Sequence, residues 1–268
     1  MPSRRQTLHL IGTSALAVSL SGIGAFAASS PQRETLTMSK ILFIATSADR
    51  MIPHDEPTGV WLEELTTPYY TFTDAGAAVT VASIAGGPIP VDARSLAAPG
   101  ENEASVERYL ADQELQSAVA KSLAFANLDA YGYDALFLPG GHGTMFDHPG
   151  NAELARIVER FDASGRIVAA VCHGPAGLVS ARKADGRPFV AGRKVAAFTD
   201  SEERAVGLDD EMPFLLETRM RELGADFQLA ENFAPFAVRD RNLVTGQNPA
   251  SARPVAALVM EALAETAD

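Results

Sequence analysis

The sequence contains one cysteine, Cys172, and its neighbours give it the setting of a nucleophile. Apolar residues precede it and His173-Gly174-Pro175 follow, so the thiol lies between a predicted strand and a predicted helix. A sharp turn there exposes the side chain at the edge of a sheet, and a helix N-terminus lowers the pKa of a thiol and can bind an oxyanion. A lone cysteine is more often an inert core residue, so this setting is what favours a reactive thiol.

A thiol nucleophile needs a base and a group that orients the base. His173 is adjacent to the thiol in sequence, and on a strained turn its ring can lie beside the sulfur. Three acidic residues follow the predicted strand 194–198 and compete for the orienting role. Glu203 is the leading candidate, while Asp200 and Glu202 stay open because spacing alone does not distinguish them.

Residues 140–143 form a glycine-rich turn, whose backbone N–H groups could approach a substrate oxygen. A plain tight loop is the alternative interpretation. The run of His54, Asp55 and Glu56 is better explained as a solvated loop than as a metal site, because adjacent residues rarely converge on one ion. His142 and His148 are expected to be turn and rim residues. We therefore predict no metal site, and the proposed chemistry needs no organic cofactor.

Short apolar runs alternate with helical patterns, which predicts a parallel sheet covered by helices on both faces. Ligand sites in such sheets lie beyond the carboxyl ends of the strands, where four segments with polar residues are expected to gather: 47–64, 140–143, 172–174 and 199–203. The predicted strands are 40–46, 78–83, 134–138, 166–171, 194–198 and 242–245. The predicted helices are 60–75, 152–163, one opening at Gly174, 211–223 and 254–264.

The chain organisation suggests an export signal followed by a single catalytic domain. Residues 1–28 contain Arg4 and Arg5, an apolar run through Phe26 and small residues suited to cleavage, which is typical of a twin-arginine signal. Residues 29–39 are a linker, and 40–268 form one domain with an insertion or flap around 86–113. This predicts a periplasmic or secreted protein. The alternative is that translation starts at Met38, which would make the protein cytoplasmic.

The charge balance limits the possible partners. The 268 residues include 22 Lys and Arg and 34 Asp and Glu, and the signal contains two of the arginines and no acid, which leaves 20 basic residues and a net charge of −14. Such an acidic chain is not expected to bind nucleic acid or, once the signal is removed, an anionic membrane. A single cysteine also excludes an intrachain disulfide.

Five stretches make the sequence resemble the DJ/PfpI superfamily, which has a class I glutamine amidotransferase-like fold, a flavodoxin-like parallel sheet between helices. The resemblance implies that Cys172 is the nucleophile and that His173, Glu203 and Glu64 act with it. It also implies backbone donors from Gly141 and His173, and a homodimer. The stretches are TGVWLEEL at 58–65, PGGHGTMFD at 139–147, AAVCHGPAGL at 169–178, FTDSEE at 198–203 and LVTGQNPASA at 243–252.

Within that superfamily the sequence is most similar to the branch of glutathione-independent glyoxalases and heat-shock-type chaperones. The implied activity is a lyase reaction that converts methylglyoxal and water to D-lactate through a Cys172 hemithioacetal, for carbonyl detoxification. A holdase chaperone or a protein deglycase is the alternative. An amidotransferase or peptidase is the weakest candidate, because glutaminases of this fold take their histidine from far downstream. Here every histidine except His173 precedes Cys172.

Overall fold

The structure, a computed structural model, describes residues 39–52 and 54–267. The signal predicted at 1–28, and the linker at 29–39 apart from Ser39, lie outside the described residues. Within the described part of the chain, no helix combines the length and apolar character needed to cross a bilayer.

A seven-stranded sheet forms the centre of the domain, in the order β10-β11-β7-β6-β1-β4-β5. Neighbouring strands are parallel except at one edge, where β10 runs antiparallel to β11. This confirms the predicted α/β fold with a mainly parallel sheet. The strands are β1 (Lys40–Ala45), β4 (Ala78–Ser83), β5 (Leu123–Ala124), β6 (Ala135–Leu138), β7 (Ile167–Val171), β10 (Ala237–Asp240) and β11 (Leu243–Gly246).

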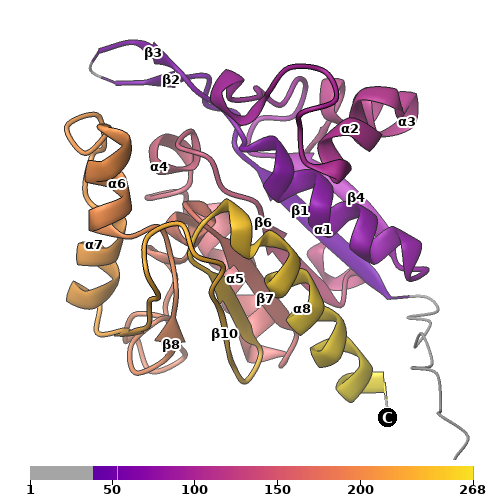
Figure 1. The fold of residues 1–268 in the computed structure, drawn as a ribbon. Helices are drawn as coiled ribbons and strands as arrows, with labels where there is room; N and C mark the ends of the chain where they lie inside the picture. Colours follow the sequence, from indigo (N-terminus) through magenta and orange to yellow (C-terminus); the bar gives the residue numbers. More distant parts are fainter. Residues whose placement is uncertain (1–38, 53, 268) are drawn as a thin grey trace, which may run out of the picture. The chain divides into compact units, whose positions relative to one another are not determined.

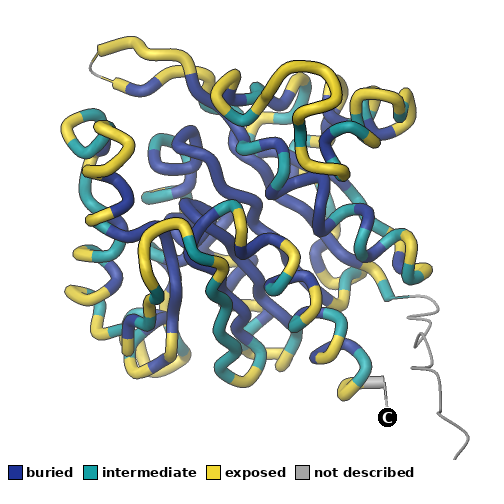
Figure 2. Tube along the Cα trace, in the orientation of Figure 1, coloured by how far each residue is buried: buried dark blue, intermediate teal, exposed yellow. Residues whose placement is uncertain are grey.

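Both faces of the central strands are buried, which is why these strands are apolar at consecutive positions rather than at every second one (Figure 2). In β1, Ile41 and Phe43 point into the same apolar cluster as residues of α1 and α8. Leu42 and Ile44 point into a second cluster on the other face, which α5 covers. The alternation places one core layer on each side of the sheet (Figure 1).

The helices that cover the sheet come largely from the predicted segments. One face carries α1 (Leu62–Asp74) and α8 (Ala252–Ala267), which pack against each other, and the other carries α5 (Ala152–Ala163). The region 86–113, predicted as an insertion or flap, contains α2 (Ala104–Ala111), which packs on α1, and leads into α3 (Gln113–Ala120). The remaining elements are β2 (Arg50–Met51), β3 (Glu56–Pro57), α4 (Thr144–Asp147), α6 (Asp200–Val206), α7 (Leu216–Glu222), β8 (Lys194–Val195) and β9 (Asp226–Phe227), with 3-10 turns at Ala93–Ser95, Phe125–Asn127, Ala130–Gly132, Gly174–Leu178 and Pro249–Ser251.

The predicted strand 194–198 is corrected by the structure. Only Lys194–Val195 pairs, and it pairs with β9 in a small separate sheet. After Val195 the backbone no longer forms the hydrogen bonds of a strand pair. The N–H of Ala196 donates to the side chain of Thr245, and the N–H of Phe198 donates to the carbonyl of Cys172. The apolar run is buried by packing beside the sheet, so it looks like a strand in the sequence without being one.

Several predicted helices also differ from the structure in their bounds or in their type. Helix α7 begins at Leu216 rather than at 211, because Pro213 disfavours helical geometry in the residue before it. Helix α1 begins at Leu62, because the backbone of Trp61 before it is extended (φ −77°, ψ 114°). The helix predicted at Gly174 is a 3-10 turn, Gly174–Leu178.

Candidate active site

Cys172 lies on a strained turn directly after β7. Its φ is +59°, in the left-handed region that non-glycine residues seldom adopt. The turn is held on both sides, because the Cys172 N–H donates to the carbonyl of Gly246 (2.9 Å) and its carbonyl accepts from the N–H of Phe198 (2.9 Å). The sequence predicted a sharp turn that exposes the side chain. The turn is present beyond the carboxyl end of the strand, but the exposure is not, because only 3% of Cys172 is exposed.

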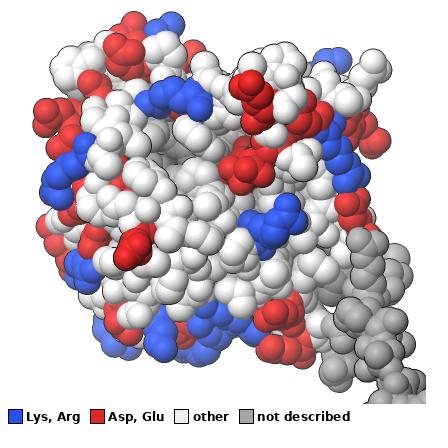
Figure 3. Space-filling model, viewed as in Figure 1, with Lys and Arg blue, Asp and Glu red and all other residues white. Residues whose placement is uncertain are grey.

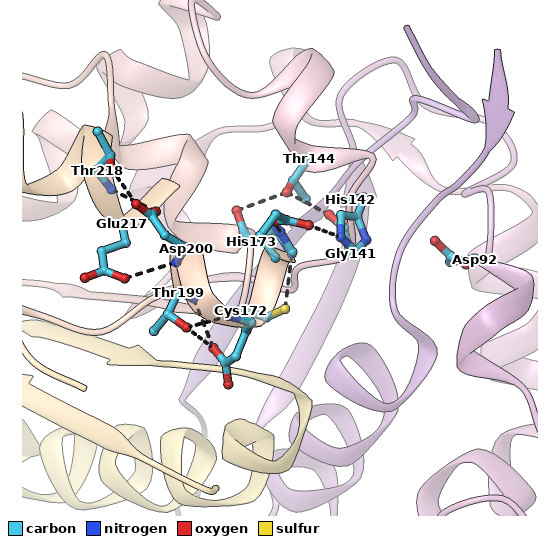
Figure 4. Close-up of polar contacts among 12 residues, drawn as sticks. Asp92, Gly141, His142, Thr144, Cys172, His173, Thr199, Asp200, Glu217 and Thr218 are labelled. Carbon is cyan, nitrogen blue, oxygen red and sulfur yellow. Dashed lines mark hydrogen bonds and ion pairs between the residues drawn. The ribbon is translucent and has the colours of Figure 1, made fainter. Parts of the chain in front are cut away.

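The His173 ring joins the thiol to a carboxylate. Its Nδ1 lies 3.3 Å from the Cys172 sulfur and its Nε2 lies 2.7 Å from Oε2 of Glu203 (Figure 4). Since a carboxylate only accepts, the Nε2 carries the proton and Nδ1 is free to accept one from the thiol. The three groups therefore have the order nucleophile, base and orienting acid.

The position of each of the three acidic residues on helix α6 determines which one forms a hydrogen bond with His173. Thr199 caps the helix in a capping box with Glu202, so Glu202 points back to the helix start. Asp200 accepts hydrogen bonds from Thr218 instead (Figure 4). Glu203 is left facing the imidazole, where the sequence analysis placed it as the leading candidate.

Glu64, in the first turn of α1, also lies next to the Cys172 thiol. It is fully buried, and its Oε2 accepts from the N–H of Gly140 at 2.9 Å. Its Oε1 makes no hydrogen bond of ordinary geometry within the described residues, while the carboxyl interacts with the thiol of Cys172. Burial raises the pKa of Glu64 well above its usual range, which favours the protonated form of this carboxyl.

The turn after β6 brings these parts together because it contains glycine. A Cβ atom on Gly140 would lie 2.6 Å from Oε2 of Glu64 and 2.7 Å from the backbone nitrogen of His173. The Thr144 hydroxyl lies within hydrogen-bond distance of the carbonyls of Gly141 and His173, and so ties the two turns together (Figure 4). Within the described residues, the N–H groups of Gly141 and His173 have no hydrogen-bond partner. They are available to an oxyanion.

The acidity of the thiol differs from the sequence prediction. Burial raises the pKa of the Cys172 thiol well above its usual range, and the nearby Glu64 carboxyl raises it further. The 3-10 turn that follows is too short for the helix N-terminus effect that the sequence analysis invoked to lower it. The thiol therefore needs its base at the moment of attack, and His173 Nδ1 is in place to take the proton.

Sequence analysis missed the role of His142, which was expected to be a turn residue. It is 5% exposed, its Nε2 lies 2.8 Å from Oε1 of Glu203, and its ring centroid is 4.2 Å from that of His173. Burial, and then the neighbouring His173, lower the pKa of His142 to about 4. Burial alone would raise the pKa of Glu203, but electrostatic attraction to His173 and hydrogen bonds from both imidazoles hold it well below its usual range. The sequence feature that could have indicated this role is a histidine within a glycine-rich turn at the end of a predicted strand.

His148, the other histidine assigned to the rim, is also buried, at 1% exposed, and its Nδ1 pairs with Asp147. His54 stays on an exposed hairpin, where it pairs with Glu211. Donor atoms of His142, His173 and Glu203 lie within 4.8 Å of one another, a set of two nitrogens and one oxygen that zinc accepts. Both imidazoles already bond to the Glu203 carboxylate through Nε2, so a metal ion held by these three residues would compete with those hydrogen bonds.

The face of the molecule seen in Figure 3 is hollowed near its centre, where Figure 1 places α4 and the end of β6. Uncharged residues line most of the hollow, with an acidic group at its right edge and a basic group above it. A small uncharged molecule suits such surroundings better than an ionic one.

The fold and the site define an α/β protein with a cysteine on the turn after a central strand and a histidine and a glutamate aligned behind its thiol. The family model of the DJ-1/PfpI family matches residues 58–262, and the chain belongs to this family. The resemblance noted in the sequence is thus confirmed.

The similar proteins belong to the branch predicted from the sequence. The chain is 32% identical to the glutathione-independent glyoxalase HSP31 of Saccharomyces cerevisiae over 237 residues, which cover 84% of this chain and 98% of the yeast protein. It is 29% identical to the protein/nucleic acid deglycase HchA of Pseudomonas aeruginosa, over 84% of this chain and 81% of that protein. The crystal structure of glyoxalase III from Candida albicans matches with a TM-score of 0.77 and 30% identity, covering 85% of this chain and 98% of that one.

Proposed function

We propose that this protein is a glutathione-independent glyoxalase that converts methylglyoxal and water to D-lactate. The observation that carries the proposal is the fully buried Glu64 carboxyl beside a thiol that is itself served by His173 and Glu203. A thiol with a base can add to an aldehyde, and a second proton-transfer group is what an aldehyde-to-acid rearrangement requires in addition. Relatives at about 30% identity bear names with this activity.

The first step is addition of the Cys172 sulfur to the aldehyde carbon of methylglyoxal. The thiol proton passes through Nδ1 of His173 to the aldehyde oxygen, which gives a hemithioacetal. The developing negative charge on that oxygen is stabilised by the N–H groups of Gly141 and His173.

A base then removes the proton from the former aldehyde carbon to give an enediol, and a proton returns at the neighbouring carbon to give a lactoyl thioester. His173 and Glu64 are both candidates for this base. Water hydrolyses the thioester and releases lactate and the thiol. One carbon is oxidised and its neighbour is reduced, so no external oxidant or cofactor is needed.

Deglycation is the second candidate, because one relative is named a protein/nucleic acid deglycase. A thiol with 3% of its residue exposed favours a small aldehyde over a carbonyl adduct on a protein chain. A holdase chaperone from the same family is the alternative in another class, and it would not require the thiol.

The test is D-lactate formation from methylglyoxal by the purified protein in the absence of glutathione. We expect stereospecific D-lactate production that Cys172→Ala abolishes, with unchanged secondary structure by circular dichroism. Lactate formed at the full rate by Cys172→Ala would disprove the thiol mechanism. Protection of an aggregating client by both forms, without lactate from either, would favour the holdase.

A further inference from the structure

Phe233, an exposed aromatic residue, lies next to the candidate active site. It is 48% exposed, and its ring centroid is 6.4 Å from that of the buried Phe198. The Phe198 ring in turn lies 4.5 Å from the imidazole of His173. These three rings form a row from the surface to the proposed base.

The backbone at Phe233 is unusual for a bulky residue. Its φ is +62°, a left-handed conformation that costs a residue with a large side chain on the order of 1–3 kcal/mol. Its N–H donates to Oε1 of Glu202 at 2.7 Å. Strained residues that the surroundings hold in place occur preferentially at functional sites, and an exposed ring is not explained by core packing.

The segment around Phe233 is attached to two neighbouring parts of the site. Helix α6 holds it through the buried Glu202 and through Ser201, whose hydroxyl donates to the side chain of Asn232 at 2.6 Å. The turn after β11 holds it through Asn248, whose side-chain amide donates to the carbonyl of Ala234 at 2.8 Å. Glu202 also accepts from the side chains of Gln247 and Asn248, so one buried carboxylate joins all three segments.

We propose that Phe233 is a specificity residue that forms an apolar wall at the approach to Cys172. Its ring contacts the substituent R of a 2-oxoaldehyde R–CO–CHO and favours an aromatic R over a methyl group. The inference rests on the proposed glyoxalase function for the identity of the reacting group. An aromatic contact of this kind corresponds to about tenfold in a rate or binding constant.

The kinetic test compares phenylglyoxal with methylglyoxal as substrates. In Phe233→Ala we expect kcat/KM for phenylglyoxal to fall about tenfold and that for methylglyoxal to change less than twofold. Phe233→Tyr should retain the wild-type ratio, because it keeps the ring. Leu229→Ala is the matched control, an equally exposed apolar residue (49%) in the same connection between β9 and β10. A ratio unchanged in Phe233→Ala, or equally changed in Leu229→Ala, would overturn the inference.

A second measurement does not depend on turnover. Cys172 is the single thiol of the chain, so its alkylation by iodoacetanilide, which carries a phenyl ring, can be compared with alkylation by iodoacetamide. We expect the alkylation rate with iodoacetanilide, divided by the rate with iodoacetamide, to fall about tenfold in Phe233→Ala. Phe233→Tyr should keep the wild-type ratio. If the wild-type protein turns over neither oxoaldehyde, the proposed function is wrong. The ratio of alkylation rates still tests whether Phe233 lines the approach to Cys172. An unchanged ratio means that Phe233 does not line the approach.

Discussion

At the scale of single residues, the site contains two glutamates near the Cys172 sulfur, and their pKa values are shifted in opposite directions. Glu203 is an anion held by two imidazoles, whereas Glu64 is buried with one hydrogen bond from a backbone N–H and has its pKa raised by burial. Pairs of carboxyls whose environments push their pKa values apart are how proteins separate acid from base roles. In this site Glu203, whose pKa is lowered, orients His173, and Glu64, whose pKa is raised, can exchange a proton.

Changing Glu64 to Gln tests this division. The amide can still donate to the sulfur but cannot exchange a proton, so D-lactate turnover should fall by about 10²–10⁴-fold. Because the Glu64 carboxyl raises the pKa of the thiol, its loss should move the midpoint of iodoacetamide alkylation against pH downward. Glu63→Gln is the control, and it should leave the turnover and the midpoint nearly unchanged. A midpoint that moves upward in Glu64→Gln, or a turnover that depends on Glu63 instead, would contradict this assignment.

His142 makes stability depend on pH. Its pKa falls from 6.5 to about 4 on folding, so the unfolded chain binds one more proton between these values. The free energy of unfolding should therefore decrease as the pH drops from 6.5 to 4, by on the order of 3 kcal/mol. The depressed pKa of Glu203 acts in the same direction, below pH 4.5.

Urea denaturation at several pH values measures this loss. His142→Gln, which can still donate to Glu203, should flatten the dependence between pH 4 and 6.5. His54→Gln, on the exposed hairpin, should keep the wild-type slope. An equal slope in His142→Gln and the wild type would show that another group binds the proton.

At the scale of elements, the site depends on two turns that fit together without a side chain between them. A Cβ on Gly140 would lie 2.6 Å from the Val171 carbonyl and as close to the Glu64 carboxyl. We expect Gly140→Ala to lower the free energy of unfolding by about 1–3 kcal/mol and to remove most turnover, because the turns must separate. Gly132→Ala, where a Cβ meets no atom within 4 Å, should be close to the wild type in thermal melts and in activity. Full activity in Gly140→Ala would mean that this contact is not needed.

The elements also show what the sequence could predict. The strands β1, β4, β6 and β7 are runs of apolar residues long enough to be recognised, and with them the position of Cys172 follows. The contact of His142 with Glu203 joins residues 61 positions apart, and no local pattern encodes it. The apolar run at 194–198 predicts a strand, but an apolar run indicates only that the residues are buried. It does not show that they pair with another strand.

At the scale of the whole molecule, the N-terminal sequence predicts export. The pair Arg4 and Arg5 predicts the twin-arginine route, so changing both to lysine should leave the full-length protein in the cytoplasm. Cell fractionation with N-terminal sequencing measures this. The wild type should appear in the periplasm or medium and begin near Ser29. A cytoplasmic protein that begins at Met38 would support the internal start instead.

The residues of the candidate active site all lie between Glu64 and Glu203, well after any point at which a signal would be removed. The twin-arginine route carries chains that have already folded. A newly made molecule would then be a working catalyst before it crosses the membrane. If both proposals hold, a cell acquires protection against reactive aldehydes in two compartments from one gene, in proportion to how long each molecule waits for transport.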